Sequence, residues 1–255
     1  MMIRDNPVID EGRILLAEHP RITTVYRSLL VIGAFVLFVF WPGGDFVRHF
    51  TAINAPVSFA VLSTVLLPLV ALTAGVFGIE RVAPEQFLTI GEWVERIGVE
   101  SWTVLWSKLF VGAVHTVALV LLPAPLLVLS AAPSATVSRV VPFALLLLLT
   151  SSLTTRAAGV AALFLFPRFP PLRRGSLAVF SLLFWGLSLR LWPAVHPLVA
   201  LLGEPGGGFW YAQVTAGYHR WTTPVFHVLL TAALVGVAAG GAWLEERRRK
   251  HAIGF

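Results

Sequence analysis

The stretch APVSFAVLSTVLLPLVALTAGVFGI, residues 55–79, carries no charged side chain from end to end. An α-helix rises about 1.5 Å per residue, so a run of this length reaches across the roughly 30 Å hydrocarbon core of a bilayer. Apolar runs of about 18 residues or more are typical of membrane-spanning helices. Residues 55–79 therefore predict a transmembrane helix.

The whole chain has the composition that such a fold requires. Of its 255 residues, 57% are hydrophobic and 13% are charged, and the mean hydropathy is +0.82. Soluble domains average about 25% charged residues, because their surfaces must be hydrated. This chain lacks the polar surface to cover a soluble core. We expect an all-α integral membrane protein in which residues 1–255 form one transmembrane domain.

Other apolar runs resemble the first, and together they predict a six-span helical bundle. The expected spans are residues 22–41, 55–79, 109–131, 140–166, 176–192 and 224–244. Arg156 interrupts the fourth run. Either that run is one tilted helix whose Arg156 side chain reaches toward the inner headgroups, or the spanning part ends near Arg156 and residues 157–166 extend along the inner leaflet.

The positions of Lys and Arg predict the orientation of the bundle. If the N-terminus is cytoplasmic, the cytoplasmic segments contain 14 of these residues and the outer segments contain four. The outer four are Arg48, Arg139, Arg190 and Arg220. Because Lys and Arg accumulate on the cytoplasmic side, we expect both termini in the cytoplasm and a location in the cytoplasmic membrane. The net charge of +6 is explained by topology and lipid headgroups, without nucleic acid.

The longest cytoplasmic connection covers residues 80–108. Its apolar positions, at three- and four-residue spacing, are Phe87, Ile90, Val94 and Ile97. Charged residues occupy the other positions, which predicts an amphipathic helix with Glu92 and Arg96 spaced as an i,i+4 ion pair. The segment is either a docking surface for a soluble partner or a helix that rests on the bilayer. The residues assigned to partner coupling are Glu80, Arg81, Glu85, Glu92, Glu95, Arg96 and Glu100.

Two further segments lie outside the predicted spans. Residues 1–21 precede the first span, and residues 6–19 mix apolar and charged side chains. This pattern predicts an N-terminal interfacial helix, with a solvated tail as the alternative. Residues 193–223 are rich in aromatic residues and include His196-Pro197. That composition favours an interfacial belt or short re-entrant helices over a ligand-gripping role.

Motifs for bond chemistry are absent from the sequence. The chain has no cysteine, no P-loop, no His-Glu-x-x-His zinc motif and no Gly-x-Ser-x-Gly nucleophile turn. No Asp or Glu lies inside a predicted span, so a proton relay would lack acidic carriers. We expect no catalytic, cofactor-binding or metal-binding residues and no enzymatic activity in this chain.

Three ionisable residues remain inside the predicted spans. They are His115 in the third span, Arg156 in the fourth and His227 in the sixth. Ionisable residues within a membrane are candidates for function. The two histidines could be axial ligands of a haem in an electron-transfer anchor, whereas the structural alternative is a neutral histidine bonded to a neighbouring helix. Arg156 is either a snorkelling or interhelix anchor or a substrate ligand.

The order of these features resembles that of one known family. An interfacial helix precedes the first span, and an amphipathic hairpin joins the second and third. The stretches that carry the resemblance are PLVALTAG (68–75), GIER (78–81), EQFLTI (85–90), SKL (107–109) and SSLTTRAA (151–158). In these respects the chain is similar to the type-2 permease subunits of ABC-type exporters. It departs from the family pattern in lacking a Thr-Pro turn and in having Ser107 where Gly is usual.

The resemblance implies a transport subunit. A permease of this family forms half of a transmembrane pathway, so a second permease copy or a related subunit is expected, with membrane lipid around both. A dimer of cytoplasmic ATPase subunits, which would hold ATP and Mg²⁺, is expected to dock against residues 80–108 and the N-terminal helix. Closure of that dimer would rock the two bundles and move a substrate. The remaining alternative is a scaffold subunit without transport of its own.

Overall fold

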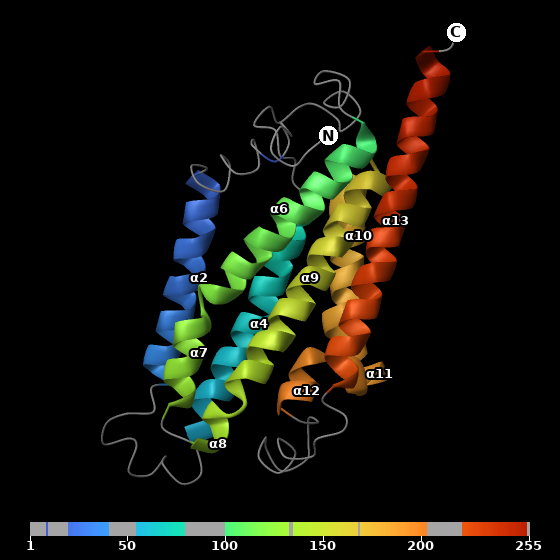
Figure 1. Cartoon of the computed structure of the whole chain (residues 1–255). Coiled ribbons are helices and arrows are strands. Elements are labelled where there is room, and N and C mark those ends of the chain that lie inside the picture. Colours follow the sequence, from blue (N-terminus) through green and yellow to red (C-terminus); the bar gives the residue numbers. More distant parts are fainter. Residues whose placement is uncertain are drawn as a thin grey trace.

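The structure, a computed structural model, describes residues 9, 20–40, 55–79, 100–132, 135–167, 169–202 and 221–253. All of the regular structure in these ranges is helical, which confirms the all-α prediction (Figure 1). The long helices are α2 (Pro20–Val39), α4 (Ala55–Ile79), α6 (Ser101–Leu121), α9 (Val141–Leu165) and α13 (Thr222–Ile253). Two short helices, α7 (Ala124–Ala131) and α8 (Ala135–Ser138), connect α6 to α9.

Five stretches of the described chain are long and apolar enough to cross a bilayer. They are residues 22–39, 57–79, 101–131, 141–165 and 222–251. Their outward faces carry large exposed apolar side chains, such as Phe38 at 80% and Leu229 at 65% exposure. Faces of this kind would aggregate in water and are compatible with hydrocarbon. The fold is thus that of a multi-pass helical membrane protein.

The third expected span, residues 109–131, begins earlier than its hydropathy indicates. The helix starts at Ser101, and Glu100 is the residue immediately before it. The helical axis is interrupted before α7, because Pro123 and Pro125 have no backbone N–H to continue the ladder of α6. Two helices at an angle therefore replace the single expected helix.

The fifth expected span, residues 176–192, falls within a longer helical run from Pro170 to Leu191. The run consists of α10 (Pro170–Ser181), the π-helical segment η2 (Leu182–Leu187) and α11 (Ser188–Leu191). After it come the 3₁₀ turn η3 (Pro193–Val195) and α12 (Pro197–Leu202). Because none of these elements reaches membrane length by itself, six spans stay a prediction.

α2 and α6 run in the direction opposite to α4, α9 and α13, and the helical run from α10 to α11, which lies between α9 and α13 in the sequence, also runs opposite to them (Figure 1). α4, α9 and α13 end, and α6 and α10 begin, at the same end of the bundle. The described cations there are Arg173, Arg174, Arg247, Arg248, Arg249 and Lys250. We call it the Arg-rich end. Arg139 and Arg190 lie at the opposite end.

α9 occupies the middle of the bundle, between α4 and α13 (Figure 1). Glycines allow the backbones of α4 and α9 to touch. A Cβ on Gly159 would overlap the carbonyl oxygen of Gly75, and a Cβ on Gly78 would lie 2.5 Å from the carbonyl oxygen of Arg156. Helices associate in lipid largely through such close contacts between small residues. The same surface carries a hydrogen bond from Thr155 Oγ1 to the carbonyl of α4 residue Ala71, 2.5 Å long.

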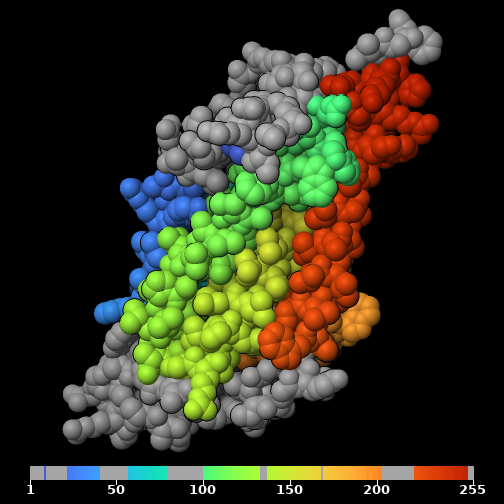
Figure 2. Space-filling view, viewed as in Figure 1, coloured from blue at the N-terminus to red at the C-terminus, as the bar shows by residue number. Residues whose placement is uncertain are grey.

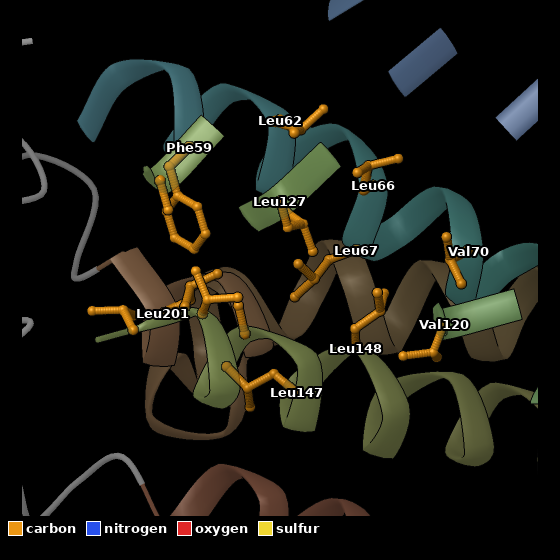
Figure 3. Packing of buried hydrophobic residues seen from close by; sticks show 14 of the residues in the cluster. Phe59, Leu62, Leu66, Leu67, Val70, Val120, Leu127, Leu147, Leu148 and Leu201 are labelled. Carbon is orange, nitrogen blue, oxygen red and sulfur yellow. The ribbon is translucent and has the colours of Figure 1, made fainter. Parts of the chain in front are cut away.

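Two clusters of buried apolar side chains surround this contact. The larger one joins α2, α4, α6, α7, α8, α9 and α12, and Figure 3 shows part of it. In it, Leu66 and Leu67 of α4 pack with Leu147 and Leu148 of α9. The smaller cluster joins α6, α9 and α13 near the Arg-rich end and consists of Val104, Leu105, Val160, Ala161, Leu163, Phe164, Ala238 and Ala242. Together the clusters hold the helices around α9.

Replacing Gly159 with Ala tests the contact between α4 and α9. The added methyl group would meet backbone, which does not yield as a side chain does, so we expect the free energy of unfolding to fall by about 1–3 kcal/mol. The matched control is Gly236→Ala on α13, where a Cβ meets nothing within 4 Å. That control should be stabilised by about 0.5–1 kcal/mol, because Ala favours a helix over Gly. Unfolding in mixed detergent micelles, followed by circular dichroism, measures both, and equal stabilities would contradict the packing.

Candidate functional site

Arg156 contacts α6 in the interior of the bundle. Its Nη1 lies 3.1 Å from Nδ1 of His115. A guanidinium group only donates hydrogen bonds, so Nδ1 of His115 accepts this one. The imidazole is therefore neutral, with its proton on Nε2. The pair joins α9, which continues unbroken through Arg156 to Leu165, to α6.

The space for Arg156 is provided by Gly112 of α6. A Cβ at this position would lie 2.5 Å from Nε of Arg156. His115, 2% exposed, packs against the rings of two other helices. Phe77 of α4 meets it edge-on with the centroids 4.7 Å apart, and Tyr26 of α2 lies at 5.8 Å. We call these five residues from four helices the Arg–His site.

The second ring nitrogen of His115 is one of several buried polar side-chain atoms without a hydrogen-bond partner in the described part of the chain. Nε2 is buried and has no hydrogen-bond partner among the residues that the structure describes. Since the tautomer places the proton on Nε2, this atom is a donor without an acceptor. Such a group costs about 1–3 kcal/mol. Buried donors without an acceptor are uncommon in native proteins.

A second polar cluster surrounds His227 and has its ring nitrogens satisfied. Nε2 of His227 donates to the carbonyl of Val195 at 3.2 Å, and Nδ1 lies 3.3 Å from Thr150 Oγ1. Thr154 Oγ1 reaches Thr231 Oγ1 at 2.9 Å and the carbonyl of His227 at 3.2 Å. These bonds join α13 to α9 and to η3. The cluster acts in interhelix bonding.

The hydrogen bonds of His227 do not support the hypothesis that it is a haem ligand. An axial ligand must offer the lone pair of a ring nitrogen to iron, and both nitrogens of His227 are within hydrogen-bond distance of protein groups. His115 also engages a different part of α9, at Arg156, from the part that His227 engages at Thr150. Within the described ranges, no three His, Asp or Glu side chains come together as a metal site would require.

His196 is a buried residue that the sequence placed only in an outer connection. It is fully buried and stands at the N-cap position of α12, where its Nδ1 accepts a hydrogen bond of 3.2 Å from the N–H of Leu198. Nε2 donates to the carbonyl of Trp185 in the π-helical segment at 3.1 Å. Pro197 follows at the first helical position, where proline is favoured. The His-Pro pair was the available sequence signal for this cap.

The Arg-rich end contains two polar connections. Arg173 of α10 is buried, and its guanidinium donates to the carbonyls of Phe166 (2.7 Å) and Pro167 at the end of α9. A cation in this position also interacts favourably with the helix dipole. Glu246 of α13 accepts a hydrogen bond of 3.3 Å from the N–H of Ser101. The start of α6 is thereby bonded to α13.

Most of the residues assigned to partner coupling lie outside the described residues. These are Glu80, Arg81, Glu85, Glu92, Glu95 and Arg96. Glu100 is described, is exposed, and directly precedes α6, with its carbonyl accepting from the N–H of Val104. The expected N-terminal interfacial helix, residues 6–19, also lies outside, apart from the single residue Ile9.

No protein-family model, curated protein or solved structure matches the chain significantly. What the site can do is therefore inferred from its own residues.

Acidification should loosen the cap of α12. Burial lowers the pKa of His196 below its ordinary value of 6.5, and the hydrogen bond to Trp185 opposes that shift without cancelling it. The unfolded chain then binds more protons than the folded one as the pH falls below 6.5, so the stability that His196 contributes is complete above that pH and is lost below it. The midpoint of thermal unfolding should fall from pH 8 to pH 5, and His196→Gln should make the decline shallower. Parallel pH profiles for the two proteins would contradict this assignment.

Proposed function

We propose that this chain is the transmembrane permease subunit of an ATP-driven exporter of the ABC type. One observation carries the proposal beyond the sequence resemblance. α4 ends at Ile79 and α6 begins after Glu100, and both of these points lie at the Arg-rich end, so the segment of residues 80–99, amphipathic in sequence, joins two points on this end. A coupling segment would meet a cytoplasmic ATPase dimer in this position.

The proposal includes six passes with the Arg-rich end in the cytoplasm. The helical run of residues 170–191 would measure about 33 Å at 1.5 Å per residue, enough to cross the hydrocarbon core as one unit. Positive residues favour the cytoplasmic side. When the run of residues 170–191 is counted as a pass, successive passes alternate in direction, so the start of α2 and the end of α13 would both be cytoplasmic.

α6 is suited to carry movement from the coupling segment to the Arg–His site. Glu100 leads directly into α6, and Gly112 and His115 follow on the same helix. A rigid helix shifts as a unit, so a displacement at Glu100 would reach His115. ATP hydrolysis on a partner could in this way change the surroundings of Arg156 without any bond chemistry in this chain.

The surface of α9 that α6 and α13 leave uncovered fits one half of a shared pathway. α6 and α13 meet near the Arg-rich end, where Leu105 packs close to Ala238 and Ala242, and they diverge toward the opposite end (Figure 1). α9 is visible between them (Figure 2). Its partly exposed positions form one helical stripe that includes Leu146, Leu149, Leu153 and Arg156. A second permease copy or a substrate from the bilayer would cover this stripe.

Single cysteines test the topology, because the chain has none of its own. Ser138→Cys and Arg190→Cys should react with a membrane-impermeant maleimide in intact cells, and Gly175→Cys and His251→Cys should react only after permeabilisation. All four positions are exposed in the structure. Labelling of positions 175 and 190 from the same side would rule out a crossing by residues 170–191.

Co-purification tests the coupling role. An ATPase with a P-loop should co-purify with the wild-type chain in mild detergent. The double variant Glu92→Lys, Arg96→Glu, in which both charges are reversed, should reduce the recovery of the ATPase at least several-fold. The matched control is Arg190→Glu, a charge reversal at the opposite end, which should leave recovery unchanged. Purification without any ATPase would favour the scaffold alternative and would contradict the proposal.

A further inference from the structure

The C-terminal part of α13 separates acidic from basic side chains. Residues 245–251 read EERRRKH. Glu245 is buried, at 8% exposure. Glu246 accepts a hydrogen bond from the N–H of Ser101 at 3.3 Å and another from Nη2 of Arg249 at 3.1 Å. The two carboxylates are therefore either buried or engaged by neighbouring groups, and they do not neutralise the rest of the stretch.

The neighbouring cations point away from the bundle. Three of them are exposed, namely Arg247, Arg248 and Lys250. We call these three residues the basic tip. The tip lies beyond the contact between Glu246 and Ser101, where α13 projects past the start of α6 (Figures 1 and 2). A stretch of mixed charge in sequence thus has a mainly positive outer surface in the fold.

The length of α13 places the basic tip at a membrane surface. Its 32 residues measure about 48 Å, whereas the hydrocarbon core is about 30 Å thick. Trp243 and Leu244 are exposed apolar side chains just before the tip, and tryptophan is enriched where hydrocarbon meets headgroups. Arg247 also lies over the ring of Trp243, 5.1 Å from its centroid.

The headgroup layer is within reach of all three cations. They follow Trp243 by about 6–10 Å along the helix. The headgroup layer is roughly 5–8 Å thick on each side of a bilayer, and long basic side chains bend toward it. Lipid phosphates are therefore accessible to the tip without any movement of α13.

The angular spread of the basic tip favours lipid over a protein surface. Successive residues of a helix are rotated by about 100°, so positions 247, 248 and 250 spread over roughly 160° of its circumference. A docked protein contacts one face of a projecting helix. Headgroups surround such a helix on every side that the bundle leaves open, so they can meet all three cations together.

We propose that the basic tip of α13 is a docking surface for anionic phospholipid headgroups in the leaflet at the Arg-rich end. A cation near a negatively charged membrane surface contributes about fivefold in affinity. Because the carboxylates of the same stretch are buried or engaged, the tip attracts lipids with net negative charge in preference to zwitterionic ones. This inference goes beyond the proposed function and requires only the multi-pass fold, without an ATPase or a substrate.

The test measures which lipids gather around the tip of the full chain. His251→Cys, the single cysteine of the labelled protein, carries an uncharged donor fluorophore in nanodiscs of phosphatidylcholine. A trace of lipid with an acceptor on its acyl chain is added, either phosphatidylglycerol or phosphatidylcholine. Energy transfer should indicate an acceptor density at least about fivefold higher for phosphatidylglycerol at low salt. This preference should shrink at about 1 M salt, where the Debye length is about 3 Å.

Three variants separate the charge of the tip from its shape. The first, Arg247→Gln with Arg248→Gln and Lys250→Gln, should reduce the preference to less than about twofold. The second, Arg247→Lys with Arg248→Lys, keeps the charge and should keep the preference. The matched control, Arg139→Gln with Arg190→Gln, removes cations from the opposite end and should also keep it. Circular dichroism checks that each variant is folded.

Equal acceptor densities for the two lipids around the wild-type chain, or an unchanged preference in the folded triple variant, would overturn the proposal. If the triple variant keeps the lipid preference and instead loses a co-purifying ATPase, the tip is a protein-docking surface and the proposal is wrong. Purification without any ATPase, together with an intact lipid preference, would count against the exporter role and support the lipid-docking surface.

Discussion

In a bilayer, an apolar side chain gains little by moving from lipid to protein, so helices must hold together through close contact and hydrogen bonds. In this protein that constraint is met along α9. Gly78 and Gly159 bring the backbones of α4 and α9 together, and Thr155 donates across the same contact to Ala71. Successive residues on a helix are rotated by about 100°. With Thr155 fixed toward α4, Arg156 must leave α9 on the adjoining face, which α6 covers.

The polar groups of the interior follow from the same constraint, because each must find a partner inside the protein. Histidines make the comparison direct. His196 and His227 each have both ring nitrogens within hydrogen-bond distance of protein groups. His115 has only one, although it is as deeply buried. Among these three histidines, the one with an unsatisfied donor lies beside the intramembrane arginine.

Hydropathy was sufficient to predict the helices but insufficient to predict which face of each helix contacts its neighbours. The second and fourth spans match α4 and α9 within about a residue, since an apolar run and a spanning helix have the same cause. The helix that contains the start of the third expected span begins earlier, at Ser101, because Lys108, which is polar in sequence, is a buried residue of α6. His115 and Arg156 were recognised separately as candidates. Their pairing depends on which side of α6 meets α9, and the mostly apolar sequence of α6 gives only a weak signal of which side that is.

Under the proposed function, α6 links the coupling segment and the Arg–His site in a way that is necessarily reciprocal. Gly112 allows α6 to pass over Arg156 without an interlocking side chain, and Ser101 fixes its other end to α13. A shift of α6 by a few ångströms would separate His115 from Arg156 and break the hydrogen bond between them. A substrate that contacts both residues would favour the position of α6 in which they are together. The substrate and the ATPase would then act on the same equilibrium between two positions of α6. Each can shift that equilibrium only if its affinity differs between the two positions.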